Sequence, residues 1–255
     1  MPDSKYSKLR LLDLFSGIGG FSYGLELSGG FETVAFCEID SYCQKILKKH
    51  WPRIPIYSDI KELTGDQLRA DGIVPDIITG GFPCTDISVA GKRKGIVGKD
   101  SGLWTEMFRL IKECQPSWAI IENVSNLRSK GLTLVLQNLS EIGYMGEFHS
   151  IPCSAIGGLH RRDRIWIIAY PNVKRLQRHR KGLEKPSQIL TQEKVSLFRG
   201  RVGEKKWSSE CRVPRILNGL PNRIQRIKAL GNAVVPQIPQ MIGEAIWKSH
   251  TTMNF

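Results

Sequence analysis

A cysteine and a glutamate each stand directly after an apolar, strand-like run of this sequence. Cys84 closes the stretch GGFPC, which follows Asp76–Thr79 (DIIT), and Glu122 follows Trp118–Ile121 (WAII). A thiolate is a strong nucleophile, although a free thiol, with a pKa of about 8.5, is mostly protonated at neutral pH. A buried carboxyl group with a raised pKa can donate a proton to the molecule under attack. A cysteine in a turn is by itself more often structural, so it is the neighbouring carboxyl group that favours a nucleophilic role.

A glycine-rich turn follows the first apolar run, Leu9–Phe15. The segment Asp13–Gly20 reads DLFSGIGG, and its glycines let the backbone approach a ligand closely while the next helix offers free N–H groups. Such a turn alone suits a dinucleotide as well as adenosylmethionine. Glu38, after the second run, is spaced to accept hydrogen bonds from ribose hydroxyls, and Asp59, after the third, suits an adenine amino group. The series predicts a nucleoside-binding pocket.

Short strand-like runs alternate with helix-compatible segments from Leu9 to Ala169. The expected strands are 9–15, 33–37, 54–57, 76–79, 118–121, 145–150 and 165–169. The first expected helix follows the glycine-rich turn and ends at Ser28. A second is expected over 41–50, with Ser41 as N-cap, and another over 237–248. This order predicts an α/β fold, with a mostly parallel sheet covered by helices on both faces. Such sheets bind ligands at the carboxyl ends of their strands.

Positive charge is concentrated in one stretch of the chain. The formal net charge is +13, and residues 171–215 hold thirteen Lys and Arg against four acids, a net charge of +9. This excess favours a polyanionic partner, nucleic acid before membrane. The stretch is expected to form a small separate lobe, with a solvated linker as the alternative.

Composition argues against several other classes of protein. The sequence has no apolar run of eighteen residues, and its N-terminus, MPDSKYSKLR, lacks the pattern of a signal peptide. We therefore expect a cytoplasmic protein without a membrane partner. The six cysteines are scattered and form no CxxC pair, which supports neither a zinc site nor a disulfide framework.

Five motifs resemble, in this order, those of the DNA (cytosine-5)-methyltransferase family. They are DLFSGIGGF, GGFPC, ENV, RRDRIWIIA and ALGNAVVPQ, and the resemblance extends over nearly the whole chain outside 171–215. The resemblance implies a Rossmann-like class I S-adenosylmethionine-dependent methyltransferase fold with a small target-recognition lobe. It divides the chain into a catalytic and cofactor-binding domain (8–170), a short basic target-recognition region (171–220) and a C-terminal segment that returns to complete the catalytic domain (221–255).

The resemblance also implies roles for single residues. Cys84 would be the nucleophile, Glu122 would bind the cytosine ring nitrogen, and Arg162 and Arg164 would hold the flipped base and its surroundings. Addition of a thiolate at carbon 6 of cytosine makes carbon 5 nucleophilic enough to attack a sulfonium methyl group. No metal is implied. The cofactor pocket is expected to be lined by Phe15, Gly17, Gly19, Gly20, Glu38, Ile39, Asp59, Ile60, Asn232 and Val234.

Double-stranded DNA is the partner that the resemblance implies. A glycine-rich cationic loop, 85–101, follows the cysteine and could close over DNA. The target base must swing out of the DNA double helix, which costs a few kcal/mol of stacking and pairing energy. Contacts with the DNA phosphates would help to offset this cost and would make the affinity depend strongly on salt. The expected DNA contacts are Ser88, Lys92, Arg93, Lys94, Arg175 and Arg178. His160 and Thr85 stand where the family usually or often has Gln, which leaves the local base contacts open.

The recognition region is shorter than is usual in the family. A short lobe reaches few base edges, and each bidentate contact discriminates by about 1–3 kcal/mol. We therefore expect a short or relaxed target sequence, or assistance from a helper subunit or another protein. The protein itself is expected to be a monomer. We expect the protein to be of bacterial, archaeal or phage origin. It could act beside a companion restriction endonuclease, in a phage, or as an orphan methyltransferase, and the sequence does not decide between these settings.

Three other functions remain as alternatives. An RNA cytosine methyltransferase would use the same chemistry, but the commoner RNA type places its cysteine after the next strand, where this chain has Glu122-Asn123. A nucleic-acid-binding module with a vestigial fold would need neither Cys84 nor Glu122. A nicotinamide-dependent oxidoreductase would have no use for GGFPC or ENV.

Overall fold

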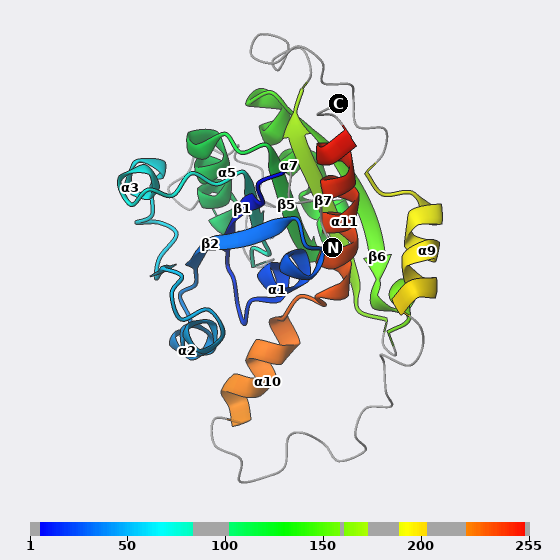
Figure 1. Ribbon diagram of the computed structural model, residues 1–255, viewed down its shortest axis with the longest axis horizontal. Helices are drawn as coiled ribbons and strands as arrows, with labels where there is room; N and C mark the ends of the chain where they lie inside the picture. Colours follow the sequence, from blue (N-terminus) through cyan, green and yellow to red (C-terminus); the bar gives the residue numbers. More distant parts are fainter. Residues whose placement is uncertain (1–5, 84–101, 159–160, 173–188, 203–222, 253–255) are drawn as a thin grey trace.

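A seven-stranded sheet forms the centre of the molecule (Figure 1). The computed structural model describes residues 6–83, 102–158, 161–172, 189–202 and 223–252. The strands are β1 (Leu9–Leu14), β2 (Phe31–Cys37), β3 (Ile56–Tyr57), β4 (Ile77–Gly80), β5 (Trp118–Val124), β6 (Tyr144–Pro152) and β7 (Asp163–Pro171), in the order β3-β2-β1-β4-β5-β7-β6. β7 runs antiparallel to both β5 and β6, and the other pairings are parallel. The predicted mostly parallel sheet is confirmed.

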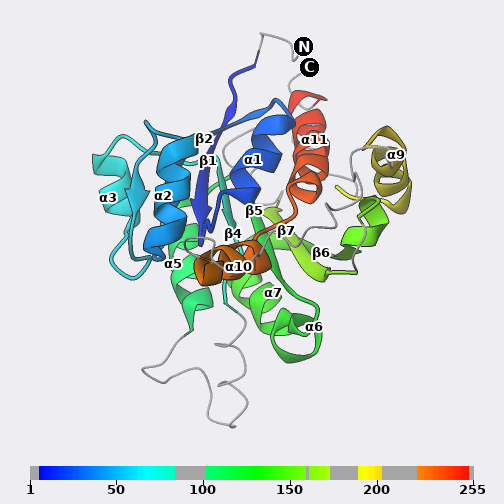
Figure 2. The ribbon, with the colours of Figure 1, turned by 90° about the horizontal axis from the view of Figure 1, so that it is seen from below.

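Helices cover both faces of this sheet (Figures 1 and 2). The described helices are α1 (Gly20–Leu27), α2 (Ser41–His50), α3 (Gly65–Ala70), α5 (Leu103–Cys114), α6 (Leu127–Lys130), α7 (Leu132–Glu141), the 3-10 helix η2 (Cys153–Ile156), α9 (Gln192–Val202), α10 (Arg223–Asn232) and α11 (Gln237–Thr252). Side chains of α1, α9 and α11 join one core cluster, and side chains of α3, α5 and α7 join the other. None of the helices in these described ranges is long and apolar enough to cross a membrane.

The two core clusters follow from the period-2 alternation of the strands. In β5, Ala119 and Ile121 pack into one cluster, while Trp118 and Ile120 pack into the other. Since successive side chains point to opposite faces and both faces are covered, the central strands β4 and β5 must be apolar almost throughout. This is why the central strands are recognisable in the sequence as continuous apolar runs.

The C-terminal segment packs against the first helix of the chain, α1. α11 packs along α1, and the approach is close because α1 carries glycines there: a Cβ on Gly20 would lie 2.7 Å from the carbonyl oxygen of Val234, and one on Gly24 would lie 2.1 Å from that of Pro236. Seen from below, α10 lies across the end of the sheet (Figure 2). The chain thus brings residues of its last thirty positions to the carboxyl ends of the first strands.

Helix α2 spans the predicted residues but has a different N-cap from the one predicted. We expected Ser41 as its N-cap, and this is wrong: Asp40 is the N-cap, and its side chain accepts hydrogen bonds from the backbone N–H groups of Tyr42 and Cys43. Asp40 has the extended backbone that a cap requires, whereas Ser41 is already helical. The carboxylate consequently lies at the positive end of the helix dipole.

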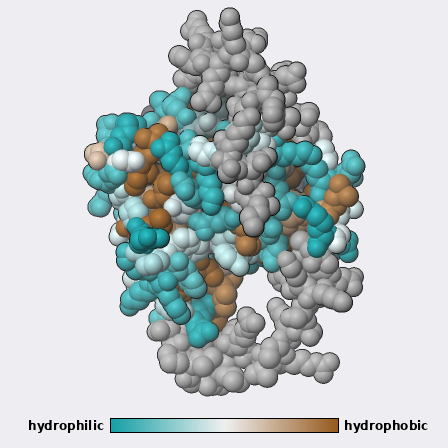
Figure 3. Space-filling model, viewed as in Figure 1, coloured by the Kyte–Doolittle hydropathy of each residue, from teal (hydrophilic) through white to brown (hydrophobic). Residues whose placement is uncertain are grey.

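A segment of the predicted recognition region packs into one of the two core clusters. Ile189, Leu190 and Phe198, before and in α9, are buried in the cluster that also holds Trp166 and Met241. Hydrophobic surface is exposed over α9 and α10 (Figure 3), where Leu197, Ile224, Ile227 and Leu230 are exposed. The boundary at 171 stays a prediction, because residues 173–188 and 203–222 lie outside the described residues.

Candidate active site

A pocket of about 470 Å³ lies at the carboxyl edge of the sheet. Most of the residues that line it lie at or just after the carboxyl ends of β1 to β5, and the others come from the start of β7 and from α2, α5 and α10. They are Phe15, Gly17, Cys37, Glu38, Ile39, Asp40, Cys43, Ser58, Asp59, Ile60, Gly81, Phe82, Pro83, Leu103, Glu122, Asn123, Val124, Arg162, Arg164, Lys228, Ala229 and Asn232. This is the edge at which parallel α/β sheets bind ligands.

The turn after β1 forms one wall of the pocket. Phe15 and Gly17 both have positive φ, 51° and 55°, so the chain turns sharply at the end of the strand. Glu38, after β2, accepts a hydrogen bond from the Gly17 backbone N–H at 2.7 Å and another from that of Asp40, also at 2.7 Å. One carboxylate therefore fixes the glycine turn against the end of the second strand.

The same half of the pocket offers the groups that an adenosine would contact. Ile39 is 74% exposed although it is a large apolar residue, and with Phe15 and Ile60 it provides apolar surface for a flat base. Asp59, after β3, is partly exposed, and one of its carboxylate oxygens accepts from the Lys61 backbone N–H at 2.9 Å. Apolar faces next to carboxylates at strand ends suit a nucleoside with hydroxyl and amino donors.

Glu122 and Arg164 form an ion pair in the other half. Their strands pair in the sheet, and the Arg164 Nε lies 2.9 Å from the Glu122 Oε1. The two side chains are only 22% and 12% exposed, Arg164 and Glu122 respectively. Burial raises the pKa of the Glu122 carboxyl group, and the cations of Arg164 and Arg162 oppose this rise. The Glu122 Oε2 lies on the side of Gly81, where an added Cβ would be 3.0 Å away.

Arg162 attaches the C-terminal segment to the pocket. Its guanidinium donates to the carbonyl oxygen of Gly231 at 2.8 Å and to that of Ala233 at 2.7 Å. Burial and the nearby Arg164 lower the pKa of Arg162. This arginine therefore holds the end of α10, and with it Asn232, at the pocket.

Asn123 connects the ENV motif to the GGFPC motif. Its buried side-chain amide donates to the carbonyl oxygen of Phe82 at 2.9 Å, and its Oδ1 accepts from the Val124 backbone N–H at 2.9 Å. Cys84 itself lies outside the described residues. Pro83, which directly precedes it in the chain, lines the pocket.

A buried carboxyl group lies behind the pocket. Asp13 is 0% exposed, and it accepts hydrogen bonds from the hydroxyl groups of Ser22, at 2.8 Å, and Thr79, at 3.0 Å. Burial raises the pKa of Asp13 to about 7, although these hydrogen bonds lower it. Asp13 thus joins α1 to the strand that leads into GGFPC.

Ten of the predicted residues lie together in this pocket. They are Phe15, Gly17, Glu38, Ile39, Asp59, Ile60, Glu122, Arg162, Arg164 and Asn232. Gly19, Gly20 and Val234 are not among the lining residues: a Cβ on Gly19 would lie 2.6 Å from the Trp51 ring, and Gly20 packs on Val234. The two glycines allow close packing behind the turn.

The predicted DNA contacts cannot be placed in the same way. Ser88, Lys92, Arg93, Lys94, Arg175 and Arg178 all lie outside the described residues.

Several polar residues that line the pocket were not among the predicted site residues, and three of them have side-chain partners of note. Asn123 belongs to the ENV motif and Asp40 follows the second strand, but the hydrogen bonds of their side chains were not predicted. Lys228, on α10, places its Nζ 3.1 Å from the Asp40 Oδ2. The sequence carries no local signal for this pair, because its members are 188 positions apart.

Comparison with known proteins identifies related sequences. A family model for the C-5 cytosine-specific DNA methylase matches residues 9–212. The chain is 36% identical over 169 residues to the Type II methyltransferase M2.BsuMI of Bacillus subtilis, and 37% identical over 162 residues to the Type II methyltransferase M.CviJI of Paramecium bursaria Chlorella virus IL3A. Each match covers 63% of this chain but 42% of the relative, so the chain spans less than half the length of these relatives.

Solved structures share the fold. The structure of Entamoeba histolytica methyltransferase EhMeth matches with a TM-score of 0.64 over 95% of this chain and 99% of that chain, at 14% identity. The S. pombe Dnmt2 methyltransferase matches with a TM-score of 0.63 over 98% of this chain and 100% of that chain, also at 14% identity. At this identity the likeness concerns the fold alone.

Proposed function

This chain belongs to the C-5 cytosine-specific DNA methylase family, and from that premise we propose that it transfers a methyl group from S-adenosylmethionine to carbon 5 of a flipped-out cytosine in DNA, through a covalent adduct with Cys84. The ion pair between Glu122 and Arg164 is the observation that carries the proposal. It places a desolvated carboxyl group with a raised pKa in the same pocket as the adenosine-compatible wall. A nucleoside-binding protein without this chemistry would not need a buried acid there.

The wall formed by Phe15, Gly17, Glu38, Ile39, Asp59 and Ile60 would hold the cofactor. Glu38 would accept from the ribose hydroxyls, Asp59 from the adenine amino group, and the apolar side chains would contact the base. When bound, the cofactor supplies an electrophilic methyl group attached to a sulfonium. Asn232, held in place through the bonds of Arg162 to its neighbours, would close the pocket from the C-terminal side.

Glu122 would act on the cytosine ring. Its raised pKa keeps a larger share of the carboxyl group protonated at neutral pH, so that it can donate to ring nitrogen 3 while the Cys84 thiolate adds at carbon 6. Arg164 fixes the Glu122 Oε1, which leaves the carboxyl group in one orientation. After methyl transfer a water molecule would take the proton from carbon 5, the Cys84 thiolate would be eliminated, and the proton on ring nitrogen 3 would return to Glu122, which restores both reacting groups of the protein.

Recognition of the DNA would rest on the basic stretch of the chain. The net charge of +9 over residues 171–215 would neutralise phosphates, which makes affinity fall steeply with salt. The described core contains α9 within this stretch, so base contacts would come from the shorter remainder or from a helper subunit. The double-stranded DNA partner, a monomeric state, a companion endonuclease and a cytoplasmic location all belong to this proposal.

Methyl transfer into defined nucleic acids tests the function. Purified protein would be incubated with S-adenosyl-[methyl-³H]methionine and either plasmid DNA or total tRNA, and the methylated plasmid would be sequenced after bisulfite treatment. We expect label in DNA, protected cytosines at a short or relaxed site, and no label with Cys84→Ser. Label in RNA but not in DNA would contradict the proposed DNA substrate. Methylation at a long and fully discriminated site would contradict the proposed short or relaxed target.

A further inference from the structure

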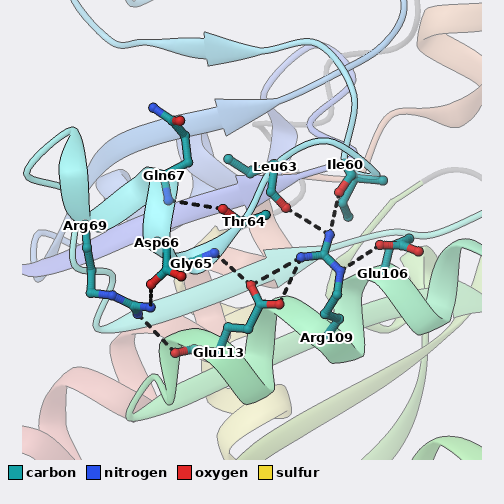
Figure 4. Close-up of polar contacts among 10 residues, drawn as sticks. All are labelled: Ile60, Leu63, Thr64, Gly65, Asp66, Gln67, Arg69, Glu106, Arg109 and Glu113. Carbon is teal, nitrogen blue, oxygen red and sulfur yellow. Dashed lines mark hydrogen bonds and ion pairs between the residues drawn. The ribbon is translucent and has the colours of Figure 1, made fainter.

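Arg109 of α5 lies at the centre of a polar cluster that the proposed reaction does not use (Figure 4). Its Nε donates to the Glu106 Oε2 at 2.9 Å, and one terminal nitrogen lies 3.1 Å and 3.2 Å from the two carboxylate oxygens of Glu113. The other terminal nitrogen donates to two backbone carbonyl oxygens, those of Ile60 and Leu63, both at 2.8 Å. All three guanidinium nitrogens are engaged, and the side chain is 28% exposed.

This cluster joins two elements that are far apart in the sequence. Ile60 and Leu63 belong to the loop between β3 and α3, whereas Arg109 and both of its acidic partners belong to α5. Glu113 strengthens the connection, because its Oε2 also accepts from the Gly65 backbone N–H at 2.7 Å, at the start of α3. The loop is therefore attached to α5 through its backbone at three points.

The attached loop is a wall of the pocket. Asp59 and Ile60 line it, and so does Leu103, the first residue of α5. Arg109 itself is not a lining residue, so it can affect a ligand only through the loop. Its partner there is the carbonyl group of Ile60, the residue next to the carboxylate that would accept from an adenine amino group.

A guanidinium is the side chain that this arrangement requires. It presents donors in a planar fork, which allows two carboxylates and two carbonyl oxygens to be bound at once. A lysine ammonium in the same place carries three donors from one atom and cannot reach four separated acceptors. A shorter or apolar residue leaves the carbonyl groups of Ile60 and Leu63 without this donor, and the loop free to move.

We propose that Arg109 is a positioning residue for cofactor selectivity: by binding the backbone of Ile60 and Leu63, it fixes Asp59 and Ile60 at the distance from Leu103 that accepts an adenine base. The inference rests on the proposed function, because it assumes that the pocket takes an adenosine-containing cofactor. It predicts that loss of Arg109 weakens binding of the adenosine portion without affecting the affinity for DNA.

Calorimetric titration without turnover tests the inference. The probes are S-adenosylhomocysteine and S-inosylhomocysteine, in which an oxygen replaces the adenine amino group. Wild type is expected to prefer the adenosyl compound. In Arg109→Met we expect its affinity to fall about tenfold or more, since the displaced Asp59 carboxylate would lose a hydrogen bond to a charged group, which is worth a factor of at least this size, and we expect the preference over the inosyl compound to shrink. The affinity of Arg109→Lys for the adenosyl compound should lie between those of wild type and Arg109→Met. The affinity of both variants for DNA should stay within about twofold of wild type.

Arg69→Met is the matched control. Arg69 also connects α3 to α5, through the Glu113 carbonyl oxygen at 3.2 Å, but its partners Asp66 and Glu113 do not line the pocket. We expect it to keep wild-type affinity and preference. The inference is overturned if Arg109→Met keeps wild-type affinity and preference. If Arg109→Met does not fold, the same result in Arg109→Lys overturns it. A loss in Arg69→Met equal to that in the Arg109 variant also overturns it. If wild type binds neither probe, the proposed function fails with it.

Discussion

The side-chain amide of Asn123 donates to the carbonyl oxygen of Phe82 at 2.9 Å, and both residues are buried. The residue after the proposed acid thereby holds the peptide two positions before the proposed nucleophile. Because β4 and β5 are neighbouring strands, this hydrogen bond fixes the end of β5, which carries Glu122, against the segment that leads to Cys84, the residue proposed to act on the same ring.

Replacing Asn123 should therefore slow the reaction more than it weakens binding. In Asn123→Ala the Phe82 carbonyl group loses its donor, which costs about 1–3 kcal/mol of stability for a buried group. Misplacement of the following residues should lower kcat by about tenfold to a hundredfold. Single-turnover methyl transfer and cofactor titration check this; a loss of cofactor affinity with unchanged kcat would contradict it.

The pH dependence of the reaction should reveal Glu122. If its protonated form is active, kcat must fall at high pH as the carboxyl group, whose pKa burial raises, loses its proton. Glu122→Gln should lower kcat by about a hundredfold or more and remove this alkaline decline. In Arg164→Met the decline should move to higher pH, because the cation that favours the carboxylate is gone. If kcat of Glu122→Gln still falls at the same alkaline pH as that of wild type, the decline is caused by another group and the prediction is wrong.

Asp13 should make stability depend on pH. Its pKa rises from an ordinary 3.8 to about 7 on folding, so between these values the folded state binds a proton that the unfolded state has lost. Unfolding free energy should then decrease as pH rises through this window, by at most about 1.4 kcal/mol per pH unit. Asp13→Asn should flatten the curve. Melting temperatures of both proteins from pH 4 to 8 provide the check, and parallel curves would refute the assignment.

Gly24 should be far less tolerant of a methyl group than Gly200, although both lie in helices. A Cβ at Gly24 would meet the Pro236 carbonyl oxygen at 2.1 Å, whereas among the described residues no atom lies within 4 Å at Gly200. We expect Gly24→Ala to lose about 1–3 kcal/mol by forcing α1 away from the returning segment. Gly200→Ala should be neutral or gain up to about 1 kcal/mol. Chemical denaturation measures both; equal effects would mean that the close approach is not required.

The sequence predicted best what depends on local pattern. Leu9–Leu14 and Trp118–Val124 were recognisable because both of their faces are buried. The start of α2 was placed correctly but its cap was not, since Asp40 and Ser41 are both good capping residues and only the backbone conformation decides between them.

Long-range contacts within the site were beyond this kind of prediction. The bonds of Arg162 to Gly231 and Ala233, and of Arg109 to Ile60, join segments whose meeting depends on how the helices pack on the sheet. No periodicity or spacing encodes such a meeting. Motifs predicted which residues gather at the sheet edge, but not which backbone groups hold them there.

Covalent trapping on DNA that contains 5-fluorocytosine tests the central claim most directly. Fluorine at carbon 5 cannot leave as a proton does, so the adduct persists after methyl transfer and can be mapped by mass spectrometry. We predict a denaturant-resistant complex that requires S-adenosylmethionine, carries the DNA on Cys84, and is absent in Cys84→Ser. A complex that persists in Cys84→Ser, or methylation by wild type without any trapped adduct, would contradict the account.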